Sequence, residues 1–403
     1  MKTLLLLHLS LILAISGGEH AHNSESQHSA EAQMDFALKI YQSIAPLSEI
    51  CPANLFISPV SIYTTLSMLA LGARSTTRQE ILQGMGPNDT ETDEELHEGH
   101  KKLLQVLSHQ SKDVKFGLGN EIFVDQSAKI LPEYRHKVAH YYNASIQTVR
   151  FRDPQTAEKT INMLVSDKTG QRIQNVAGNS KTSMVLLDYA VFEAKWKSEF
   201  KKKHTEMRPF MRGPTPVSVP MMYRAGVYKT YRDTEMNADV VKIPYAGNTD
   251  LLIIVPQLGD LRRVEQELTP RRVKKYLHSV KSSVVELYIP KISFSSAVSL
   301  ERALLHMDMA IIFDKKKADF SKISETQKLS VSSIFHRSST RLEEGGAEES
   351  AATSTKVRLA ISSPRFSVER PFLMLIYHKP THAVLGIGRY SDPLDPGNEK
   401  AEK

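Results

Sequence analysis

The chain has 403 residues, of which 41% are hydrophobic and 24% are charged, and its formal net charge is +7. These fractions are typical of a folded globular protein and exclude a collagen-like, disordered or disulfide-scaffold chain. The single cysteine, Cys51, excludes an internal disulfide and a zinc site made of cysteines. The positive charge favours anionic partners.

The N-terminus predicts secretion. Lys2 is followed by an apolar run from Leu4 to Ile15 and then by small residues, which is typical of a cleaved signal peptide over residues 1–16. This run is too short for a membrane span and no later apolar stretch is long enough, so no membrane association is expected. Asn88 and Asn143 each begin a glycosylation sequon, which suits an extracellular protein.

Helices are expected mainly in the first half of the chain. Residues 17–33 are polar and predict a disordered tail, after which apolar residues recur at helical spacing. The expected helices run from an N-cap at Asp35 to Pro46, from Ser58-Pro59 through Ala70, and from Asp153-Pro154 to Gly170.

Strands are expected mainly in the second half. The runs that predict them are Met184–Phe192, Leu251–Val255, Val284–Ile289, Phe372–Tyr377 and Ala383–Ile387, of which the last two are expected to pair. The segments Lys328–Phe335 and Phe366–Tyr377 are also strand-like. Helices early and strands late predict an α+β fold. Because there is no internal repeat and no long linker, we expect one domain over residues 34–393, followed by a tail at 394–403.

Motifs for catalysis and cofactor binding are missing from the sequence. It has no G-x-S-x-G, G-x-G-x-x-G, P-loop or H-E-x-x-H motif. The segment His97-Glu98-Gly99-His100 has the wrong spacing for a zinc site, and we interpret it as the solvated face of a polar helix. No cofactor, metal or nucleic acid is therefore expected, and no enzymatic activity.

One buried carboxylate is expected inside the apolar run at 184–192. Asp188 needs a partner there, since isolated burial of a charge is costly. His336 and the hydroxyls of Ser58 and Ser61 are the candidate partners. Although Ser, His and Asp can form a hydrolase triad, nothing supplies an exposed nucleophile or an oxyanion hole, so a buried hydrogen-bonded cluster is the favoured interpretation.

A long loop without large apolar residues starts at Glu343. Through Thr355 it is acidic and then rich in small residues, and strand-like segments flank it on both sides. A long exposed loop in a compact domain is usually functional. Its small side chains would fit between strands of an existing sheet, and residues 356–361 resemble a protease substrate.

The sequence resembles the serpin family, in its secreted antitrypsin-like branch, over about residues 34–393. The segments that carry the resemblance are Asn54–Ser61, Leu71-Gly72-Ala73, Asp188–Trp196, Val219–Met222 and Arg370-Pro371-Phe372. The resemblance implies a serpin fold with three β-sheets, about nine helices and an exposed reactive-centre loop over 343–365. It also implies a monomeric inhibitor of an extracellular serine protease. The protease cleaves the loop, which then inserts into a β-sheet.

The same resemblance places the functional residues of the loop. In an ungapped register the scissile bond is Ala360-Ile361, with Arg358-Leu359 as the alternative. The implied hinge comprises Glu344, Gly345, Gly346, Ala347, Glu348, Glu349, Ser350, Ala351 and Ala352.

Some residues depart from the family pattern. Alternate residues of a strand face the same way, so insertion turns either Glu348 or Glu349 inward, and the family pattern selects Glu349. Asp188 stands where the family usually has Asn, and Glu369 stands where it has Asn or Asp. Gly386 stands where Phe is common. These departures leave open a non-inhibitory serpin that carries a hormone or small ligand, or that binds glycosaminoglycan.

A basic helix is expected within residues 262–281, which contain seven Lys or Arg and two Glu. A cationic stripe of this kind binds polyanions by releasing counterions, and the matching helix binds heparin in some serpins of this branch. The candidate heparin ligands are Arg271, Lys274, Lys275, His278 and Lys281. A second basic run, Lys201–His204, is compatible either with an extension of this patch or with a separate loop.

Overall fold

A computed structural model describes residues 32–47, 54–86, 92–108, 113–168, 184–257, 261–278, 280–326, 328–345 and 364–395. The expected signal peptide, most of the expected polar tail, Cys51 and Asn88 lie outside these ranges. So do residues 346–363, which hold most of the expected reactive-centre loop.

Nine α-helices occur in the described residues, one over 32–44 and eight labelled α2 to α9. They are α2 (Pro59–Gly72), α3 (Ser75–Met85), α4 (Asp93–Ser108), α5 (Pro132–Tyr142), α6 (Pro154–Lys168), α7 (Leu261–Glu267), α8 (Pro270–His278) and α9 (Glu301–His306), with short 3₁₀ helices η1 (Lys202–His204) and η3 (Ile311–Phe313). The helix over 32–44 already includes residue 32, so it starts before the expected N-cap at Asp35. As expected, α2 follows Ser58, because Pro59 presets the first helical φ.

The strands form two hydrogen-bonded sheets. The five-stranded sheet has the order β10-β11-β4-β2-β3, and the nine-stranded sheet has the order β1-β14-β13-β8-β7-β6-β9-β12 with β5 paired to β6. Their bounds are β1 (Leu55–Ile57), β2 (Val114–Asp125), β3 (Ser145–Val149), β4 (Met184–Ala194), β5 (Glu206–Phe210), β6 (Val217–Asp233), β7 (Ala238–Pro244), β8 (Thr249–Pro256), β9 (Lys281–Pro290), β10 (Ile292–Ser299), β11 (Val331–Leu342), β12 (Arg365–Ser367), β13 (Phe372–His378) and β14 (Val384–Tyr390).

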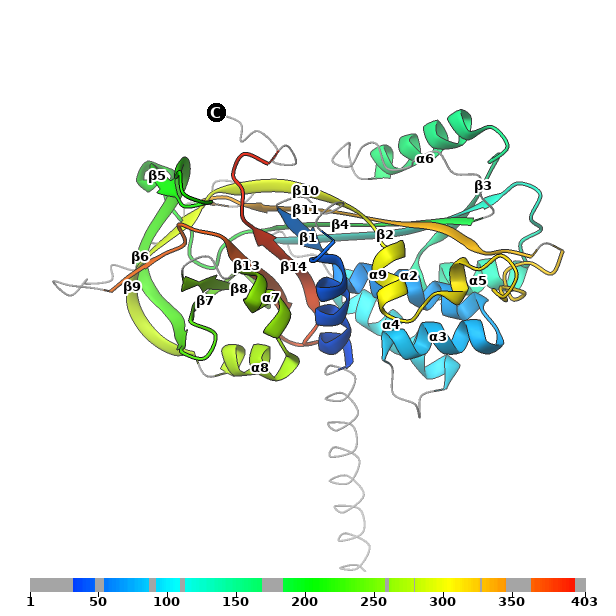
Figure 1. Ribbon diagram of the computed structural model, residues 1–403, viewed down its shortest axis with the longest axis horizontal. Coiled ribbons are helices and arrows are strands. Elements are labelled where there is room, and N and C mark those ends of the chain that lie inside the picture. Colours follow the sequence, from blue (N-terminus) through cyan, green and yellow to red (C-terminus); the bar gives the residue numbers. More distant parts are fainter. Residues whose placement is uncertain are drawn as a thin grey trace, which may run out of the picture.

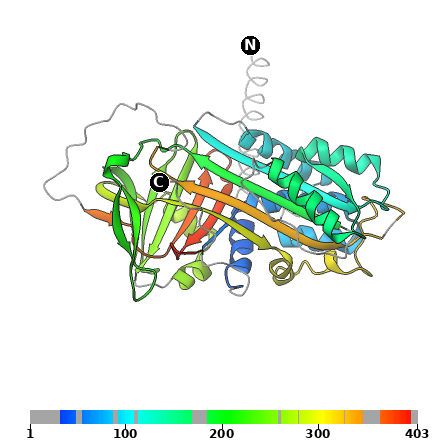
Figure 2. The same ribbon diagram turned by 90° about the horizontal axis from the view of Figure 1, so that it is seen from above.

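The five-stranded sheet is covered on both faces over part of its length. Figures 1 and 2 show α6 crossing one face, while α2 to α5 lie on the other. Side chains alternate accordingly: Met184 and Leu186 of β4 belong to the main core, whereas Val185 and Leu187 pack with Ile161 of α6. Burial on both faces explains why β4 is almost continuously apolar.

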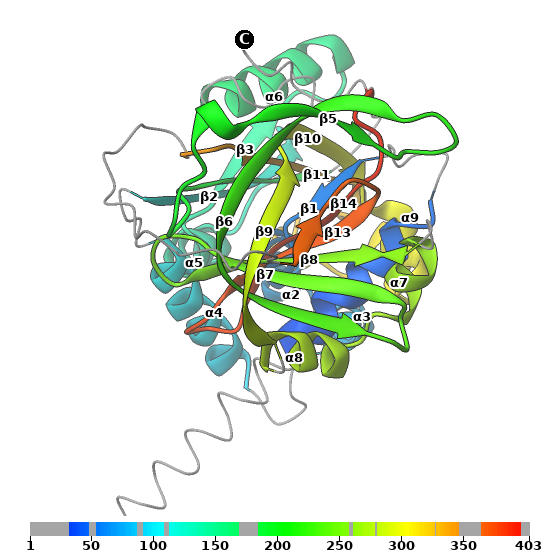
Figure 3. The same cartoon turned by 90° about the vertical axis from the view of Figure 1, so that its left-hand side faces the viewer.

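The nine-stranded sheet fills the other half of the molecule (Figure 3). It is continuous because β6 and β9 are long and pair from Met221↔Pro290 to Thr230↔Lys281. One end of this ladder pairs with β5 and β12, and the other with β7. Two of the three expected sheets are therefore joined into one, within the expected α+β fold.

The strands expected from apolar runs are present, and most of them match the expected bounds to within three residues. The expected strand Lys328–Phe335 is β11, which starts later and extends to Leu342. The expected strand Phe372–Tyr377 is β13, which extends to His378. The longer strand-like segment Phe366–Tyr377 is divided between β12 and β13, and the gap contains Pro371, which donates no backbone hydrogen bond. Strands β13 and β14 pair as expected, and the pairing is antiparallel.

Candidate functional site: the loop between β11 and β12 and the sheet beside it

The candidate reactive-centre loop connects two strands of different sheets. It leaves the end of β11 at Leu342 and returns at Arg365, where β12 pairs with β9. The structure describes its two ends, up to Gly345 and from Pro364 onwards. Both candidate scissile bonds, Ala360-Ile361 and Arg358-Leu359, and the hinge residues from Gly346 to Ala352 lie outside the described residues.

The first residue of the hinge, Glu344, is buried, contrary to the expectation of an exposed loop from Glu343. Glu344 is only 5% exposed. Its Oε1 accepts a hydrogen bond from Thr205 Oγ1 at 2.8 Å, and its Oε2 lies 3.3 Å from Lys291 Nζ. Its carbonyl oxygen accepts the Phe200 N–H at 2.9 Å. The acidic composition of the segment suggested solvent, but these partners compensate the carboxylate and allow its burial.

Electrostatics keep Glu344 ionised. Burial alone would raise the pKa of this carboxyl, but its own backbone N–H, the Thr205 hydroxyl and Lys291 together hold the pKa below its usual value. The charged form is therefore the one that holds the hinge at this end of β11.

An aromatic cluster supports the same end of the sheet. Trp196 Nε1 donates a hydrogen bond to the Glu343 carbonyl oxygen at 2.6 Å. Its indole stacks on Tyr245 at a centroid distance of 4.5 Å and meets Phe200 edge-on at 5.6 Å. Trp196 follows β4 and Glu343 follows β11, so this bond joins the two strands where the loop departs.

Strands β4 and β11 are direct neighbours and run parallel. They pair from Val331↔Met184 to Thr340↔Phe192, with one irregularity between Val331 and Ser333. A chain that turned back from the end of β11 would run antiparallel to both strands and fit between them. Such a strand would replace one parallel ladder with two antiparallel ladders, which are slightly more stable per residue.

The buried cluster at the middle of this pair contains Asp188 and His336. These residues face each other in the β4–β11 register and are fully buried. His336 Nδ1 makes a short hydrogen bond with Asp188 Oδ1, while His336 Nε2 accepts the Ser58 N–H at 3.0 Å. Because Nε2 is an acceptor, the ring is neutral and its Nδ1–H donates to Asp188. The cluster thus ties both strands to the start of α2.

The serine hydroxyls do not take the expected part in this cluster. Ser61 Oγ lies 3.4 Å from the Tyr189 carbonyl oxygen, and Ser58 Oγ has no hydrogen-bond partner among the described residues. The expectation that these hydroxyls pair with Asp188 or His336 is therefore wrong, because the Ser58 backbone N–H already occupies Nε2. A histidine bonded in this way cannot activate the Ser58 hydroxyl, so the arrangement is not a hydrolase triad.

The basic helix is α8, and its two faces divide as expected. Val273, Tyr276 and Leu277 are buried, while Arg271, Lys275 and His278 are exposed, as is Lys281 at the start of β9. Lys274 is half-buried. Lys275 Nζ lies 5.4 Å from the centre of the Tyr231 ring, and a hydrogen bond to that tyrosine raises the pKa of Lys275.

Arg272 has a structural role beside this stripe. It pairs with Asp233 at 2.9 Å and with Glu235 at 3.2 Å, and Tyr276 also donates a hydrogen bond to Asp233. These bonds anchor α8 to the turn between β6 and β7.

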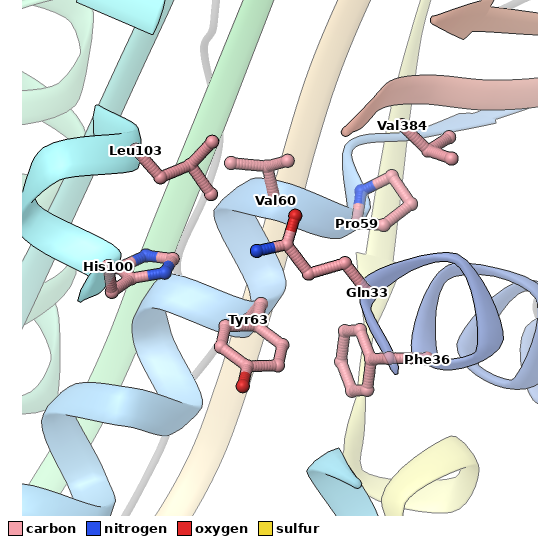
Figure 4. Close-up of a pocket in the computed structure, with 8 residues that line it drawn as sticks. All are labelled: Gln33, Phe36, Pro59, Val60, Tyr63, His100, Leu103 and Val384. Atoms are coloured by element: carbon pink, nitrogen blue, oxygen red, sulfur yellow. The ribbon is translucent and has the colours of Figure 1, made fainter. Parts of the chain in front are cut away.

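The expectation of a solvated face at His97 and His100 is wrong. Both residues are buried where α4 packs against α2 and α5: His97 Nδ1 makes a short hydrogen bond with the Tyr142 hydroxyl, and His100 Nε2 lies 2.8 Å from Thr64 Oγ1. His100 also borders a cavity of about 10 Å³. Figure 4 shows the Gln33 amide reaching toward this space from the helix over 32–44. The helical spacing of His97, His100, Leu103 and Leu107 was the signal for a buried face.

Asn143 is exposed and lies in the left-handed region, with φ of 48°, as the C-cap of α5. Its sequon partner Ser145 makes a short hydrogen bond to Glu121.

Among the described residues, no group of three or more His, Cys, Asp or Glu could hold a metal ion. No helix in the described part of the chain is long and apolar enough to cross a membrane.

Comparison with known proteins defines the class. The family described as "Serpin (serine protease inhibitor)" matches residues 31–393. The chain therefore belongs to the serpin family.

Individual relatives place it among the clade A serpins. It is 35% identical to serine protease inhibitor A6 of Xenopus laevis over 94% of this chain and 87% of that protein, and 35% identical to human serpin A9 over 89% and 88%. Among solved structures, human thyroxine-binding globulin complexed with thyroxine has a TM-score of 0.83 at 29% identity, covering 91% of this chain and 99% of that one. Human kallistatin gives a TM-score of 0.83 at 29% identity, covering 92% and 99%.

Proposed function

We propose that this serpin is a secreted serine protease inhibitor that acts as a suicide pseudosubstrate. An extracellular serine protease cleaves its loop at Ala360-Ile361, or alternatively at Arg358-Leu359, and forms an acyl-enzyme. The N-terminal part of the loop then inserts between β4 and β11 and carries the protease with it. Residues 1–16 act as the signal peptide, Asn88 and Asn143 carry glycans, and the inhibitor acts as a monomer.

The observation that carries this proposal is the parallel pairing of β4 and β11 directly beside the loop. In the described state these strands pair with each other, and Glu344 at the start of the hinge bonds to Thr205 instead of lying between them. Residues 345–355 are as many as the 11 residues of β4, so they can pair along its whole length. The driving force is then the gain of a central antiparallel strand.

The test mixes the protein with an elastase-like and a trypsin-like protease, each also as its inactive active-site Ser→Ala form. We expect a denaturant-stable complex with one active protease and none with its inactive form. Clean cleavage without a complex would contradict inhibition. The protease that forms the complex distinguishes Ala360 from Arg358, because a small primary pocket favours the former residue and an acidic one the latter.

Glu349 is the residue that can convert this inhibitor into a substrate. If insertion buries its carboxylate, the cost slows insertion and gives the protease time to escape. We expect Glu349→Ala to raise the ratio of complex to cleaved product, measured by denaturing gel electrophoresis. Glu348→Ala is the matched control, since alternate residues face opposite sides of a strand. Equal ratios of complex to cleaved product for wild type and Glu349→Ala would contradict this role of Glu349.

A small-ligand carrier is the second candidate function. It is supported by the likeness to thyroxine-binding globulin and by a cleft of about 550 Å³ between the starts of α4 and α5, which Tyr134 and Tyr141 help to line. This volume falls within the usual range of small-molecule sites. Calorimetric titration with thyroxine, for wild type and Tyr141→Ala, tests the idea, and absence of heat with wild type excludes this ligand.

Heparin binding at α8 is a third candidate. It is supported by a cationic stripe made of Arg271, Lys274, Lys275 and His278 on α8 and of Lys281 at the start of β9. Retention on heparin that survives neutralisation of Arg271, Lys274 and Lys275 would remove the assignment to α8.

A further inference from the structure

A small cavity lies where three helices meet, and none of the functions proposed above uses it. It is bordered by the helix over 32–44, by α2 and by α4, next to the start of β14. Most of its lining is apolar and includes Phe36, Val60, Tyr63 and Leu103. No residue of this lining also lines the cleft of about 550 Å³ between the starts of α4 and α5. The cavity is therefore a separate site.

Two polar side chains reach into this apolar space, and each has a buried atom that makes no hydrogen bond. Gln33 Oε1 and His100 Nδ1 are both buried and have no hydrogen-bond partner among the described residues. Figure 4 shows the amide end of Gln33 between Val60 and Tyr63, on the side that faces His100. A buried acceptor without a donor costs free energy. Both atoms therefore favour an occupant, or a rearrangement, that brings them an N–H or O–H group.

The hydrogen bonds of His100 show that its free nitrogen is an acceptor. The Thr64 hydroxyl donates to the Val60 carbonyl oxygen at 2.7 Å, so its oxygen accepts the hydrogen bond from His100 Nε2–H at 2.8 Å. Burial keeps the ring neutral, because it lowers the pKa of His100 to about 3. The side chain is only 4% exposed. His100 Nδ1 therefore presents a lone pair that only a hydroxyl or N–H donor can satisfy.

The rings around this lone pair favour a flat occupant. The centre of the Tyr63 ring lies 5.3 Å from that of His100, and the Phe36 ring meets Tyr63 edge-on at 5.2 Å. Aromatic rings attract a further ring in such offset and edge-on arrangements. An aromatic ring that carries a donor combines this packing with the hydrogen bond that His100 lacks.

Gln33 is the lining residue that can make room for such a ring. It is half-buried, whereas the other lining residues are buried. With its side chain in place, the cavity of about 10 Å³ holds one water-sized group. The empty space is about 250 Å³ when the opening to solvent is included, and an apolar cavity of about 150 Å³ is enough for one benzene ring. If the Gln33 side chain turns outward, water satisfies its Oε1.

We propose that this cavity binds a small molecule of the phenol class, with one aromatic ring and one hydroxyl group. The ligand hydroxyl donates to His100 Nδ1, and its ring packs against Phe36 and Tyr63 in place of the Gln33 side chain. Both unused acceptors then gain a donor, His100 from the ligand and Gln33 from water. A single buried water could donate to both acceptors, but it gains nothing from the apolar and aromatic walls.

The test is calorimetric titration of the full protein with phenol and with toluene, which has nearly the same shape but no donor. We expect phenol to bind wild type, and to bind Gln33→Ala about tenfold more tightly because no side chain has to move. Gln42→Ala changes a glutamine of the same helix that does not line the cavity, and it should keep the affinity of wild type. In the Gln33→Ala background, His100→Leu should lower the ratio of phenol to toluene affinity about tenfold or more.

A second measurement needs no change at His100, in case that variant does not fold. Phenol should shift the ¹⁵Nδ1 resonance of His100 in Gln33→Ala and leave that of the exposed His136 unchanged. Absence of phenol binding to Gln33→Ala overturns the proposal and leaves water as the occupant. An affinity ratio that His100→Leu does not change, or an unshifted His100 resonance, overturns it as well. Because protease complexes are assayed without phenol, these outcomes are independent of the inhibitory function.

Discussion

At the residue scale, buried charges and close contacts explain where this chain departs from simple expectations. Glu344 belongs to a segment whose composition predicts solvent exposure, yet its carboxylate is buried against Thr205 and Lys291. Sequence alone could not place those partners, because they come from segments about 50 and 140 residues away in the chain. Their effect on the hinge can be measured with single substitutions.

Replacing Glu344 by Gln should destabilise the native hinge. The variant loses the ion pair with Lys291 and weakens the hydrogen bond from Thr205, so we expect the free energy of unfolding to fall by about 2 kcal/mol. Denaturant unfolding at neutral pH measures the change. Glu343→Gln is the matched control, since its carboxylate is farther from Lys291, at 3.9 Å, and is more exposed. Similar losses for both variants would contradict the special position of Glu344.

The pH dependence of Glu344 has a defined sign. Its pKa is lowered in the folded state, so its stabilisation is present above the unfolded pKa of about 4.5 and is lost as pH falls through the folded pKa. We therefore expect the stabilities of wild type and Glu344→Gln to converge as pH falls through the lowered folded pKa of Glu344.

Gly386 is explained by a close approach of β1. A Cβ added at this position would lie 2.2 Å from the Phe56 ring, so the ring occupies the space that a side chain at residue 386 would need. We expect Gly386→Ala to cost about 1–3 kcal/mol of stability through overpacking. Gly117→Ala, where nothing lies within 4 Å of the added Cβ, should cost less.

A double-mutant cycle tests this explanation. Phe56→Leu should recover part of the loss caused by Gly386→Ala, because it removes the atoms that clash. Strict additivity of the two substitutions, measured by thermal unfolding, would show that the contact is not the cause.

At the scale of elements, two packing contacts place ionisable groups in the core. One is the contact of α4 with α2 and α5, and the other is the contact of β4 with β11. Burial of α4 against α2 and α5 lowers the pKa of His97 to about 4 and that of His100 to about 3. The polar composition of α4 led to the wrong prediction that both histidines are exposed. Histidine is classed as a polar residue, although its neutral ring packs well in a core. The apolar run of β4, by contrast, identified its strand from sequence alone.

These histidines predict acid sensitivity. Their folded pKa values lie below the unfolded value of about 6.5, so their stabilisation is complete above pH 6.5 and falls as pH decreases toward 4. In that range each histidine contributes up to about 1.4 kcal/mol per pH unit to the slope of the free energy of unfolding against pH. Urea unfolding between pH 7 and 4 tests this, with His100→Gln expected to flatten the slope. His140→Gln, at an exposed site of α5, is the control variant.

The contact between β4 and β11 leads to a second prediction at this scale. Asp188→Asn keeps an oxygen acceptor for the His336 Nδ1–H and removes a fully buried carboxylate whose Oδ2 has no hydrogen-bond partner among the described residues. We expect the variant to be more stable by about 1–3 kcal/mol at neutral pH. A lower melting temperature than that of wild type would show that the charge stabilises the strand pair.

At the scale of the whole molecule, the order of helices and strands predicted an α+β fold, and the motif from Asn54 to Ser61 identified the family. The continuity of the nine-stranded sheet could not be predicted, because it depends on the length of β6 and β9 rather than on their composition. The position of Lys201–His204 could not be predicted either. Its neighbours Phe200 and Thr205 bond to Glu344, and Figures 1 and 3 show the following strand β5 and α8 at opposite ends of the sheet.

The central claim is that the described state stores free energy that loop insertion between β4 and β11 releases. The most direct measurement compares the melting temperature of the intact protein with that of the same protein nicked within residues 356–361. We expect the nicked form to melt far above the intact form, because the loop has become a central strand. Equal melting temperatures would contradict it and leave the carrier or polysaccharide-binding role as the better explanation.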